Sequence, residues 1–297
     1  MKRVLLTMML VAIAALSINA ASKYEINVAG VEVTSSNCNN VTGGDILGGT
    51  VKYDPTSNTL TLTNVTISRS GGSNYGIHNR DCAGLKMKFV GTCNISCTTA
   101  NAIHLDKTTT IEITSSSTLN AKMTAGENYG RGVIYVNGSA GASFLGPGTL
   151  NVSGQMKSGG STSSCATCGF EGKGKSNSCY VAISDDLNVV MNVTHDGFYK
   201  FDYVHIYTGD VKINFNYGFR ALDQIGELNL WNDMACVTPA DATFNANSGY
   251  FGGNDYYTHF TNDYGEIITT EKFPDANFRS SLRSLVSPEE YFTKAQL

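Results

Sequence analysis

The sequence predicts an all-β chain, in the form of a right-handed parallel β-helix with an N-terminal β cap and a short helical C-terminal tail. Three observations predict this fold. A short phrase recurs at intervals suited to one coil, strand-like segments lie between its copies, and Gly, Ser, Thr and Asn are abundant while charged residues make up only 15% of the chain. Such a composition favours many short strands and turns over long amphipathic helices.

The recurring phrase joins a small residue to an apolar one in most of its copies. Its apolar residues are separated by steps of 26, 30, 37, 31 and 18 positions, most of which suit one coil with loops of varying length. One coil cannot bury its inward residues alone, so stacking of successive coils is expected to form the core. The apolar residues are Ile77, Ile103, Val133, Phe170, Phe201 and Phe219.

Alternating segments between these residues predict strands with one face buried and one in water. Two or three short strands per coil are expected. The predicted strands are 85–89, 94–96, 111–113, 118–120, 149–152, 187–189, 211–215 and 228–230. Before them, 24–33 and 51–62 predict two hairpins, with turns at Ala29-Gly30 and at 54–58, that cap the first coil.

The N-terminus has the pattern of a secretory signal. Lys2 and Arg3 precede an uncharged apolar stretch at 4–16, and small residues follow, with cleavage expected after Ala20. The stretch is shorter than the roughly 20 residues that a membrane span needs, and no later stretch is apolar enough to cross a membrane. The sequence thus predicts an exported protein, either secreted or at the cell surface, without a transmembrane segment.

Charge and cysteine content limit the partners and cofactors. Acidic residues (25) exceed basic ones (21) and no basic patch is visible, which argues against nucleic acid and against anionic membranes. Eight cysteines in an exported chain favour disulfides, with pairing left open and free buried thiols as the alternative. Cys165, Cys168 and Cys179 lack an obvious fourth ligand for zinc, so no metal and no cofactor is predicted.

Three features in order carry a resemblance to a known group of proteins: the segment 26–34, the segment 48–54 with 59–64, and the Gly-Ile phrases. Over roughly residues 24–235 the chain resembles secreted bacterial proteins described as carbohydrate-binding-domain or right-handed β-helix proteins. The resemblance implies the fold and, less specifically, a carbohydrate ligand.

Near residue 256 the Gly/Asn-rich strand pattern ends and a helical pattern begins. The segment 271–282 predicts a helix that begins at Pro274 and places Phe278, Leu282 and Leu285 on one face. The phrase 273–279 resembles the leader that precedes leucine-rich repeats in bacterial surface proteins. The expected organisation is therefore a signal peptide at 1–20, a capped β-helix at 21–255 and a helical tail at 256–297.

No sequence motif of a known catalytic type is present, so catalysis would depend on residues that stacking brings together. Stacked copies of the phrase predict a polar column of the residues that follow the apolar ones, interrupted at Ile134. Its members are His78, His104, Glu171, Asp202 and Arg220, of which Glu171, Asp202 and Arg220 are the weak catalytic candidates. The ordinary interpretation of such a column is a solvated face.

Sugar binding requires aromatic rings for apolar sugar faces and polar groups for hydroxyls. Aromatic residues cluster late in the chain, where the alternative is core filling or end capping. The ligand-binding candidates are Tyr199, Tyr203, Tyr207, Trp231, Tyr256 and Tyr257. The sequence thus favours a non-catalytic surface protein that binds polysaccharide or host glycan, with a polysaccharide lyase or hydrolase and a structural spacer as alternatives; it leaves the ligand and the oligomeric state open.

Overall fold

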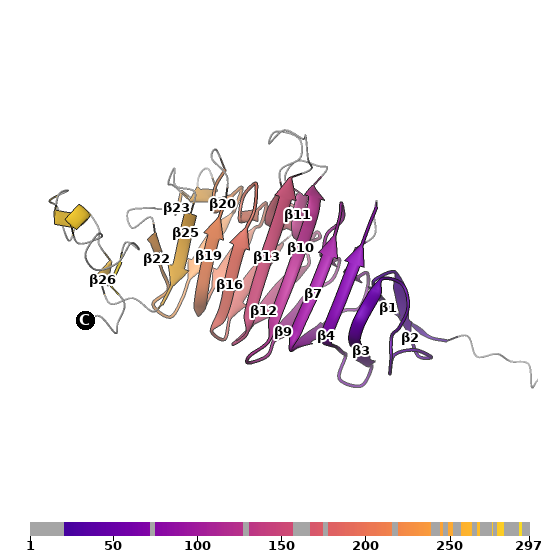
Figure 1. Ribbon diagram of the computed structural model, residues 1–297. Helices are drawn as coiled ribbons and strands as arrows, with labels where there is room; N and C mark the ends of the chain where they lie inside the picture. Colours follow the sequence, from indigo (N-terminus) through magenta and orange to yellow (C-terminus); the bar gives the residue numbers. More distant parts are fainter. Residues whose placement is uncertain are drawn as a thin grey trace, which may run out of the picture.

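The computed structural model describes 21–71, 75–126, 131–156, 167–174, 178–215 and 219–238 as the main body, with shorter pieces to residue 292. The chain is all-β, and most strand pairs in the main body are parallel, in a solenoid-like arrangement. Figure 1 shows the strands side by side along a long axis, with β1 to β4 at one end and β22 and β25 toward the other.

One sheet contains eight strands in the order β2-β1-β5-β8-β11-β14-β17-β20. From β5 onward its neighbours are parallel and come from successive stretches of chain. Its strands are β1 (Lys23–Val28), β2 (Val31–Thr34), β5 (Ile77–Asn79), β8 (Ile103–Leu105), β11 (Arg131–Val136), β14 (Thr167–Gly172), β17 (Phe198–Tyr199) and β20 (Leu222–Asp223).

The second sheet consists of two parallel ladders that meet at β4 (Thr59–Arg69), whose first half pairs with β6 and whose second half pairs with β7. The first ladder is β6 (Leu85–Val90), β9 (Thr109–Ile113), β12 (Gly141–Leu145), β15 (Tyr180–Ser184), β18 (Tyr203–Ile206) and β21 (Glu227–Leu230). The other is β7 (Thr92–Cys97), β10 (Thr118–Gly126), β13 (Thr149–Met156), β16 (Leu187–Asn192) and β19 (Gly209–Asn214). Successive chain segments thus add strands to three parallel ladders in turn.

Antiparallel pairs cover the N-terminal end of the stack and one of the three ladders at the other end. At the N-terminal end β1 pairs antiparallel with β2 and β5, and β3 (Ile46–Asp54) pairs antiparallel with β4. At the other end β25 (Tyr257–Thr261) lies between β19 and β22 (Ala235–Thr238), antiparallel to both. These pairings occupy strand edges that would otherwise be open to another chain.

Both predicted N-terminal hairpins are present. Ala29 and Gly30 both have positive φ in the turn between β1 and β2, and the Gly30 amide donates to Asn27 Oδ1 over 2.9 Å. In the turn between β3 and β4, Asp54 accepts hydrogen bonds from the Thr56 amide (2.9 Å) and the Ser57 hydroxyl (2.7 Å). In both turns an Asn or Asp side chain accepts hydrogen bonds from residues a few positions along the chain, as these residues commonly do in turns.

The register of the eight-stranded sheet corrects half of the predicted stack. Ile77, Ile103 and Phe170 lie at equivalent positions as predicted, but Val133, Phe201 and Phe219 do not. Other residues occupy the equivalent positions in those coils. The aligned residues of the six coils are then separated by more even steps of 26, 31, 36, 28 and 24 positions. The aligned residues are Ile77, Ile103, Ile134, Phe170, Phe198 and Leu222.

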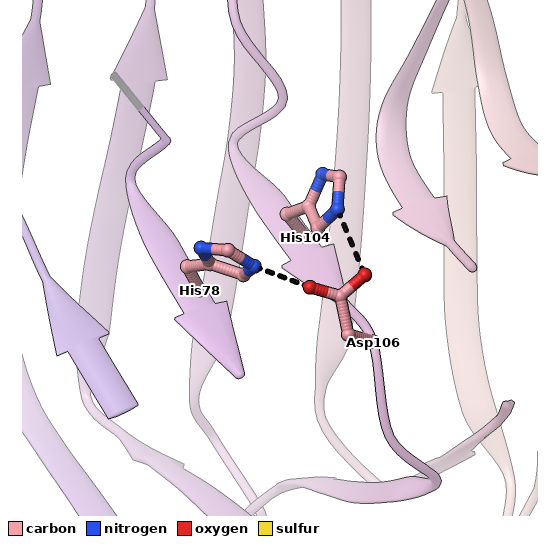
Figure 2. Close-up of side chains that lie close together, drawn as sticks. All are labelled: His78, His104 and Asp106. Atoms are coloured by element: carbon pink, nitrogen blue, oxygen red, sulfur yellow. Dashed lines mark hydrogen bonds and ion pairs between the residues drawn. The ribbon is translucent and has the colours of Figure 1, made fainter. Parts of the chain in front are cut away.

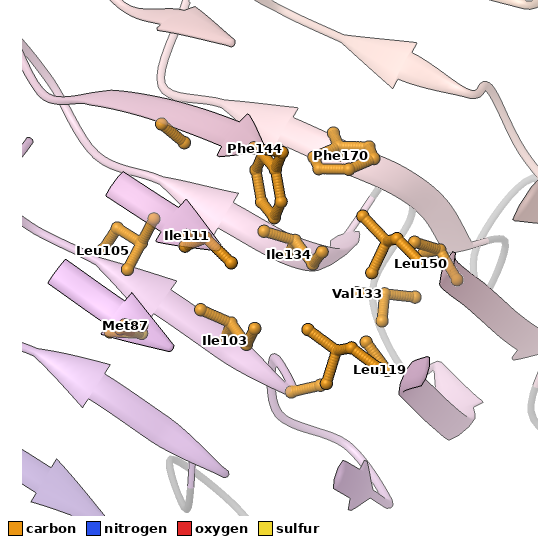
Figure 3. Close-up of a cluster of buried hydrophobic side chains, with 14 of the residues drawn as sticks. Met87, Ile103, Leu105, Ile111, Leu119, Val133, Ile134, Phe144, Leu150 and Phe170 are labelled. Atoms are coloured by element: carbon orange, nitrogen blue, oxygen red, sulfur yellow. The ribbon is translucent and has the colours of Figure 1, made fainter. Parts of the chain in front are cut away.

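The core follows from this register, because side chains at equivalent positions stack on one another between the ladders. Phe170 is fully buried, with its ring centroid 5.3 Å from that of Phe144 and 5.1 Å from that of Phe198. Figure 3 shows Phe144 and Phe170 beside Ile134, Val133 and the aliphatic side chains of neighbouring coils. The buried residues of all three ladders form one continuous cluster.

An asparagine ladder lies on the outer face of the β7-β10-β13 segment. Asn120 Nδ2 donates to Asn94 Oδ1, and Asn151 Nδ2 donates to Asn120 Oδ1, each over 2.8 Å. The three residues are paired in register. Part of the high asparagine content therefore serves to link successive coils.

We expect Asn120→Ala to lower the unfolding free energy by about 1–2 kcal/mol, since it removes one donated and one accepted hydrogen bond. The melting temperature followed by circular dichroism should fall by about 2–4 °C for each kcal/mol. Lys122→Ala, two residues along the same face of β10, is the control and should change it less. Equal melting of the two variants would contradict a stabilising role for the ladder.

The described cysteines do not follow the disulfide interpretation. Cys38, Cys82, Cys93, Cys97 and Cys179 are free thiols, and all but Cys82 are buried. Cys93 and Cys97 lie on one strand, β7, and both point inward. Four residues of extended strand separate their Cα atoms by roughly 13 Å, which is too far for a disulfide. Cys165 lies outside the described residues.

The C-terminal part is described only in pieces. They include the short pairs β23 (Phe244–Asn245) with β24 (Tyr250–Phe251) and β26 (Glu266–Ile267) with β27 (Tyr291–Phe292). Residues 278–281 are helical, and Asp275 accepts from the Phe278 amide as a helix N-cap does. Within the described parts of the chain, no helix has the length and apolar character of a membrane span. The predicted boundary at 255–256 stays a prediction, as does the signal at 1–20, which lies outside the described residues.

Candidate functional site

A row of four aromatic rings lies on the outer face of β18 and the residues that follow β18 and β21. We call Tyr203, His205, Tyr207 and Trp231 the aromatic strip. Successive centroids are 5.8, 6.0 and 5.8 Å apart, with planes tilted by 8°, 26° and 15°. Such spacing and tilt describe offset, nearly parallel rings.

The strip follows from the alternation of β18 and from parallel stacking. Alternate residues of a strand face the same way, so Tyr203, His205 and Tyr207 share the outer face while Val204 and Ile206 are buried. Ile206 pairs with Leu230, which places Trp231 beside Tyr207 on the next coil. Trp231 thus extends the row across the stack.

The ends of the strip are open to solvent. Trp231 is 50% exposed and Tyr203 39% exposed, and they are two of the four large exposed apolar side chains among the described residues. Most aromatic side chains of the described residues are buried or half-buried, so this placement marks the strip as a candidate contact surface.

Polar groups lie beside the rings. Glu227 pairs in register with Tyr203, and Asn229 pairs with His205, so both point to the same face as the strip. Partial burial lowers the pKa of His205, against the opposing effect of the Glu227 carboxylate. His205 is therefore neutral at pH 7, and the strip presents aromatic surfaces together with one carboxylate, one amide and one imidazole.

The structure brings together three of the six predicted ligand-binding residues: Tyr203, Tyr207 and Trp231. Tyr199 lies on β17 in the other sheet and is only 6% exposed, which leaves little of its ring for a ligand. Tyr257 is half-buried on β25, 6.2 Å from the His259 ring. Tyr256 lies outside the described residues. Sequence reasoning missed His205, although its alternation with Tyr203 and Tyr207 was the available signal.

A second group of polar residues forms on the eight-stranded sheet, as the stacked phrase suggested. The register places His78, His104 and Glu171 in one column, as predicted, but it replaces the remaining members. The sequence predicted that Ile134 would interrupt the column, but the residue between His104 and Glu171 is Tyr135. Beyond Glu171 the column continues with Tyr199 and Asp223. We call His78, His104, Tyr135, Glu171, Tyr199 and Asp223 the polar column.

Asp202 and Arg220, the other weak catalytic candidates, lie outside the polar column. Asp202 accepts a hydrogen bond from the Cys179 amide over 2.8 Å in the turn before β18. Arg220 Nη1 lies 3.5 Å from Asp223 Oδ1. The register therefore does not stack either residue on Glu171.

The first two members of the polar column meet the carboxylate of Asp106, in the turn after β8 (Figure 2). His78 Nε2 lies 2.7 Å from Asp106 Oδ2, and His104 Nε2 lies 3.3 Å from Oδ1. We call these three residues the His-Asp cluster. Sequence reasoning placed both histidines in one column but missed Asp106, because only the turn after β8 directs its side chain back to them.

The surroundings set the charges in this region. Burial lowers the pKa of His104 to about 4, and nearby His78 acts in the same direction. Burial would raise the pKa of Asp106, but hydrogen bonds from His78 and Asn137 hold it below its usual value. Burial also raises the pKa of Glu171, although the Gly132 amide donates to it over 2.9 Å.

A pocket of about 360 Å³ adjoins the cluster. The His104 ring lies between those of Tyr75 and Tyr135, with centroids 4.2 and 4.7 Å away. Burial is the main cause that raises the pKa of Tyr135 to about 12, and the nearby Glu171 carboxyl acts in the same direction. The pocket therefore has an aromatic wall and several polar groups. It is lined by Tyr75, Asn101, His104, Arg131, Tyr135, Asn137 and Glu171.

The chain matches no protein-family model, and comparisons with curated proteins and with solved structures likewise find no match. The function must therefore be argued from the aromatic strip, the polar column and the pocket themselves.

Proposed function

We propose that this chain is an exported surface protein, built as a right-handed parallel β-helix, that binds a polysaccharide or host glycan without cleaving it. The observation that carries the proposal is the aromatic strip, with its two exposed ends and its neighbouring carboxylate and amide. Rings that lie about 6 Å apart suit contact with the apolar faces of consecutive sugars, while Glu227 and Asn229 suit their hydroxyl groups.

Three parallel ladders filled in turn by successive chain segments support the β-helix. The right hand is the expected one, because crossovers between parallel strands are right-handed in nearly all known cases. The apolar stretch that follows Lys2 and Arg3 supports export. The resemblance to secreted bacterial β-helix and carbohydrate-binding-domain proteins supports the same kind of protein.

Trp231 allows a direct test, because it is the one tryptophan of the chain and lies at an end of the strip. Titration with plant, mucin and bacterial polysaccharides should change its fluorescence for at least one glycan. In affinity electrophoresis through that glycan, Trp231→Ala and Tyr203→Ala should each lose most of the retardation, since buried aromatic anchors dominate such contacts.

Phe278→Ala is the matched control, since Phe278 is 52% exposed and lies outside the strip. It should bind like the unaltered protein. Unaltered retardation of Trp231→Ala and Tyr203→Ala would overturn the strip as the binding surface, and silence toward every glycan would favour a structural role.

The pocket beside the polar column favours a second candidate, a polysaccharide lyase or hydrolase. Glu171 has a raised pKa and faces a pocket that also contains Tyr135 and Arg131, which is a suitable place for an acid in glycan cleavage. Formation of new reducing or unsaturated ends from a bound glycan, lost in Glu171→Gln, would replace the binding proposal with this one.

A further inference from the structure

The His-Asp cluster combines two imidazole nitrogens and a carboxylate, and one atom from each lies within 4.8 Å of the other two. Donor atoms bound to one zinc ion lie about 3.3–3.5 Å apart, given bond lengths of about 2.1 Å. The cluster therefore needs only small side-chain shifts to surround one ion. Parallel pairing of β5 with β8 fixes the two histidines, and Asp106 follows His104 by two residues.

The hydrogen bonds of Asn101 decide the tautomer of His104. Asn101 Nδ2 donates to the Gly132 carbonyl over 2.5 Å, so its Oδ1 is the atom that faces His104 Nδ1 at 3.0 Å. An amide oxygen accepts only, so Nδ1 carries the hydrogen of the neutral ring. The Nε2 lone pair of the neutral ring then points at a carboxylate oxygen.

Two acceptors facing each other at 3.3 Å repel unless a proton or a metal ion lies between them. Asn137 supports the carboxylate from another side, since its Nδ2 donates to Asp106 Oδ1 over 2.5 Å. His78 presents a lone pair to the same place in one of its two tautomers. Asn101 and Asn137 thus hold the ligands as the outer residues of metal sites do.

We propose that His78, His104 and Asp106 bind one divalent transition-metal ion of the zinc type, with its remaining coordination positions open to water or to a ligand in the adjoining pocket. Two nitrogen donors and one oxygen donor suit zinc and its neighbours in the first transition series, whereas calcium and magnesium require mainly oxygen donors. Three protein ligands with an open position are the arrangement of zinc sites that act on a ligand. The proposal is independent of glycan binding by the aromatic strip.

The test begins with protein freed of metal by a chelator. Isothermal titration with Zn²⁺ alone should give one site per chain that is lost in His104→Ala and in Asp106→Asn. Asn101→Ala should weaken the affinity by about 10–100-fold, as loss of an outer residue does. Mg²⁺ and Ca²⁺ should not compete. His205→Ala, which removes a half-buried histidine of the aromatic strip, is the control and should bind normally.

Imidazole nitrogen NMR of the unaltered protein keeps the test decisive if a variant does not fold. Zn²⁺ should shift the Nε2 signals of His78 and His104 and leave that of His205 in place. Absence of zinc binding, or zinc binding that leaves both Nε2 signals unchanged because the ion binds thiols instead, would overturn the proposal. Binding of undiminished strength in His104→Ala and Asp106→Asn would do the same.

Discussion

Phe170→Ala is expected to lower the unfolding free energy by about 3–5 kcal/mol, the cost of removing a fully buried aromatic side chain. Phe170 lies in the middle of the stack, between Phe144 of the neighbouring sheet and Phe198 of the next coil. The alanine leaves a cavity lined by side chains of two ladders, which β-sheet pairing on both sides of β14 prevents from closing. The midpoint of urea unfolding should therefore fall sharply.

Phe170→Leu is the control, because it keeps most of the volume and costs under about 1.5 kcal/mol. Unfolding followed by circular dichroism should give similar denaturant dependence for both variants, so that the midpoints compare stability directly. A midpoint for Phe170→Ala no lower than that of Phe170→Leu would mean that the core around β14 is not packed as Figure 3 shows it.

The alternation and the turns were enough to predict many of the strands, although β12, β15 and β18 were not among those predicted. The segments 85–89 and 211–215 alternate clearly, and they appear as β6 and β19. The hairpins were predictable because residues such as Asp54 and Asn27 make bonds with near neighbours, which sequence displays. Both features depend only on interactions close along the chain.

The register was less predictable, since it depends on loop lengths and on backbone pairing between coils. Phe201 resembled an aligned core residue and is fully buried, but it follows β17, and Phe198 takes the aligned place. The error moved the later part of the predicted polar column to Asp202 and Arg220, away from Tyr199 and Asp223. Because β17 is only two residues long (Phe198–Tyr199), it offers no alternation from which this slip of three residues could be detected.

The candidate sites likewise contain some residues that could be predicted from spacing along the chain and others that depend on strand pairing between coils. Tyr203 and Tyr207 could be predicted to share a face because they are four residues apart, an even spacing in extended chain; Tyr203 lies on β18 and Tyr207 directly follows it. Trp231 lies beside them only because β18 pairs with β21. The clustering of aromatic residues late in the chain was compatible with this neighbourhood but could not establish it. Asp106 was missed because the sequence shows a turn there and not the direction of its carboxylate.

Gly197→Ala is the second large effect that we expect. The residue before the aligned core residue is small in five of the six coils (Gly76, Ala102, Gly169, Gly197 and Ala221) and is Val133 in the other. A Cβ on Gly197 would lie 2.7 Å from the Ala221 carbonyl oxygen and 2.6 Å from Ile213 Cγ2. That oxygen cannot move away freely, because it accepts the Phe198 amide over 2.8 Å.

The added methyl group must therefore push two coils apart or break the bond from Phe198, and we expect a loss of about 1–3 kcal/mol. Thermal melting should show it as a fall of about 2–4 °C for each kcal/mol. Gly48→Ala is the control, since Gly48 is exposed on β3 and a Cβ there would meet nothing within 4 Å. If Gly197→Ala melts no lower than Gly48→Ala, close approach of the coils does not explain the small residue in the recurring phrase. A lower melting temperature in Gly197→Ala alone means that the recurring phrase reflects how closely the coils stack. Its glycines are then required for packing of the coils and not for binding of a ligand.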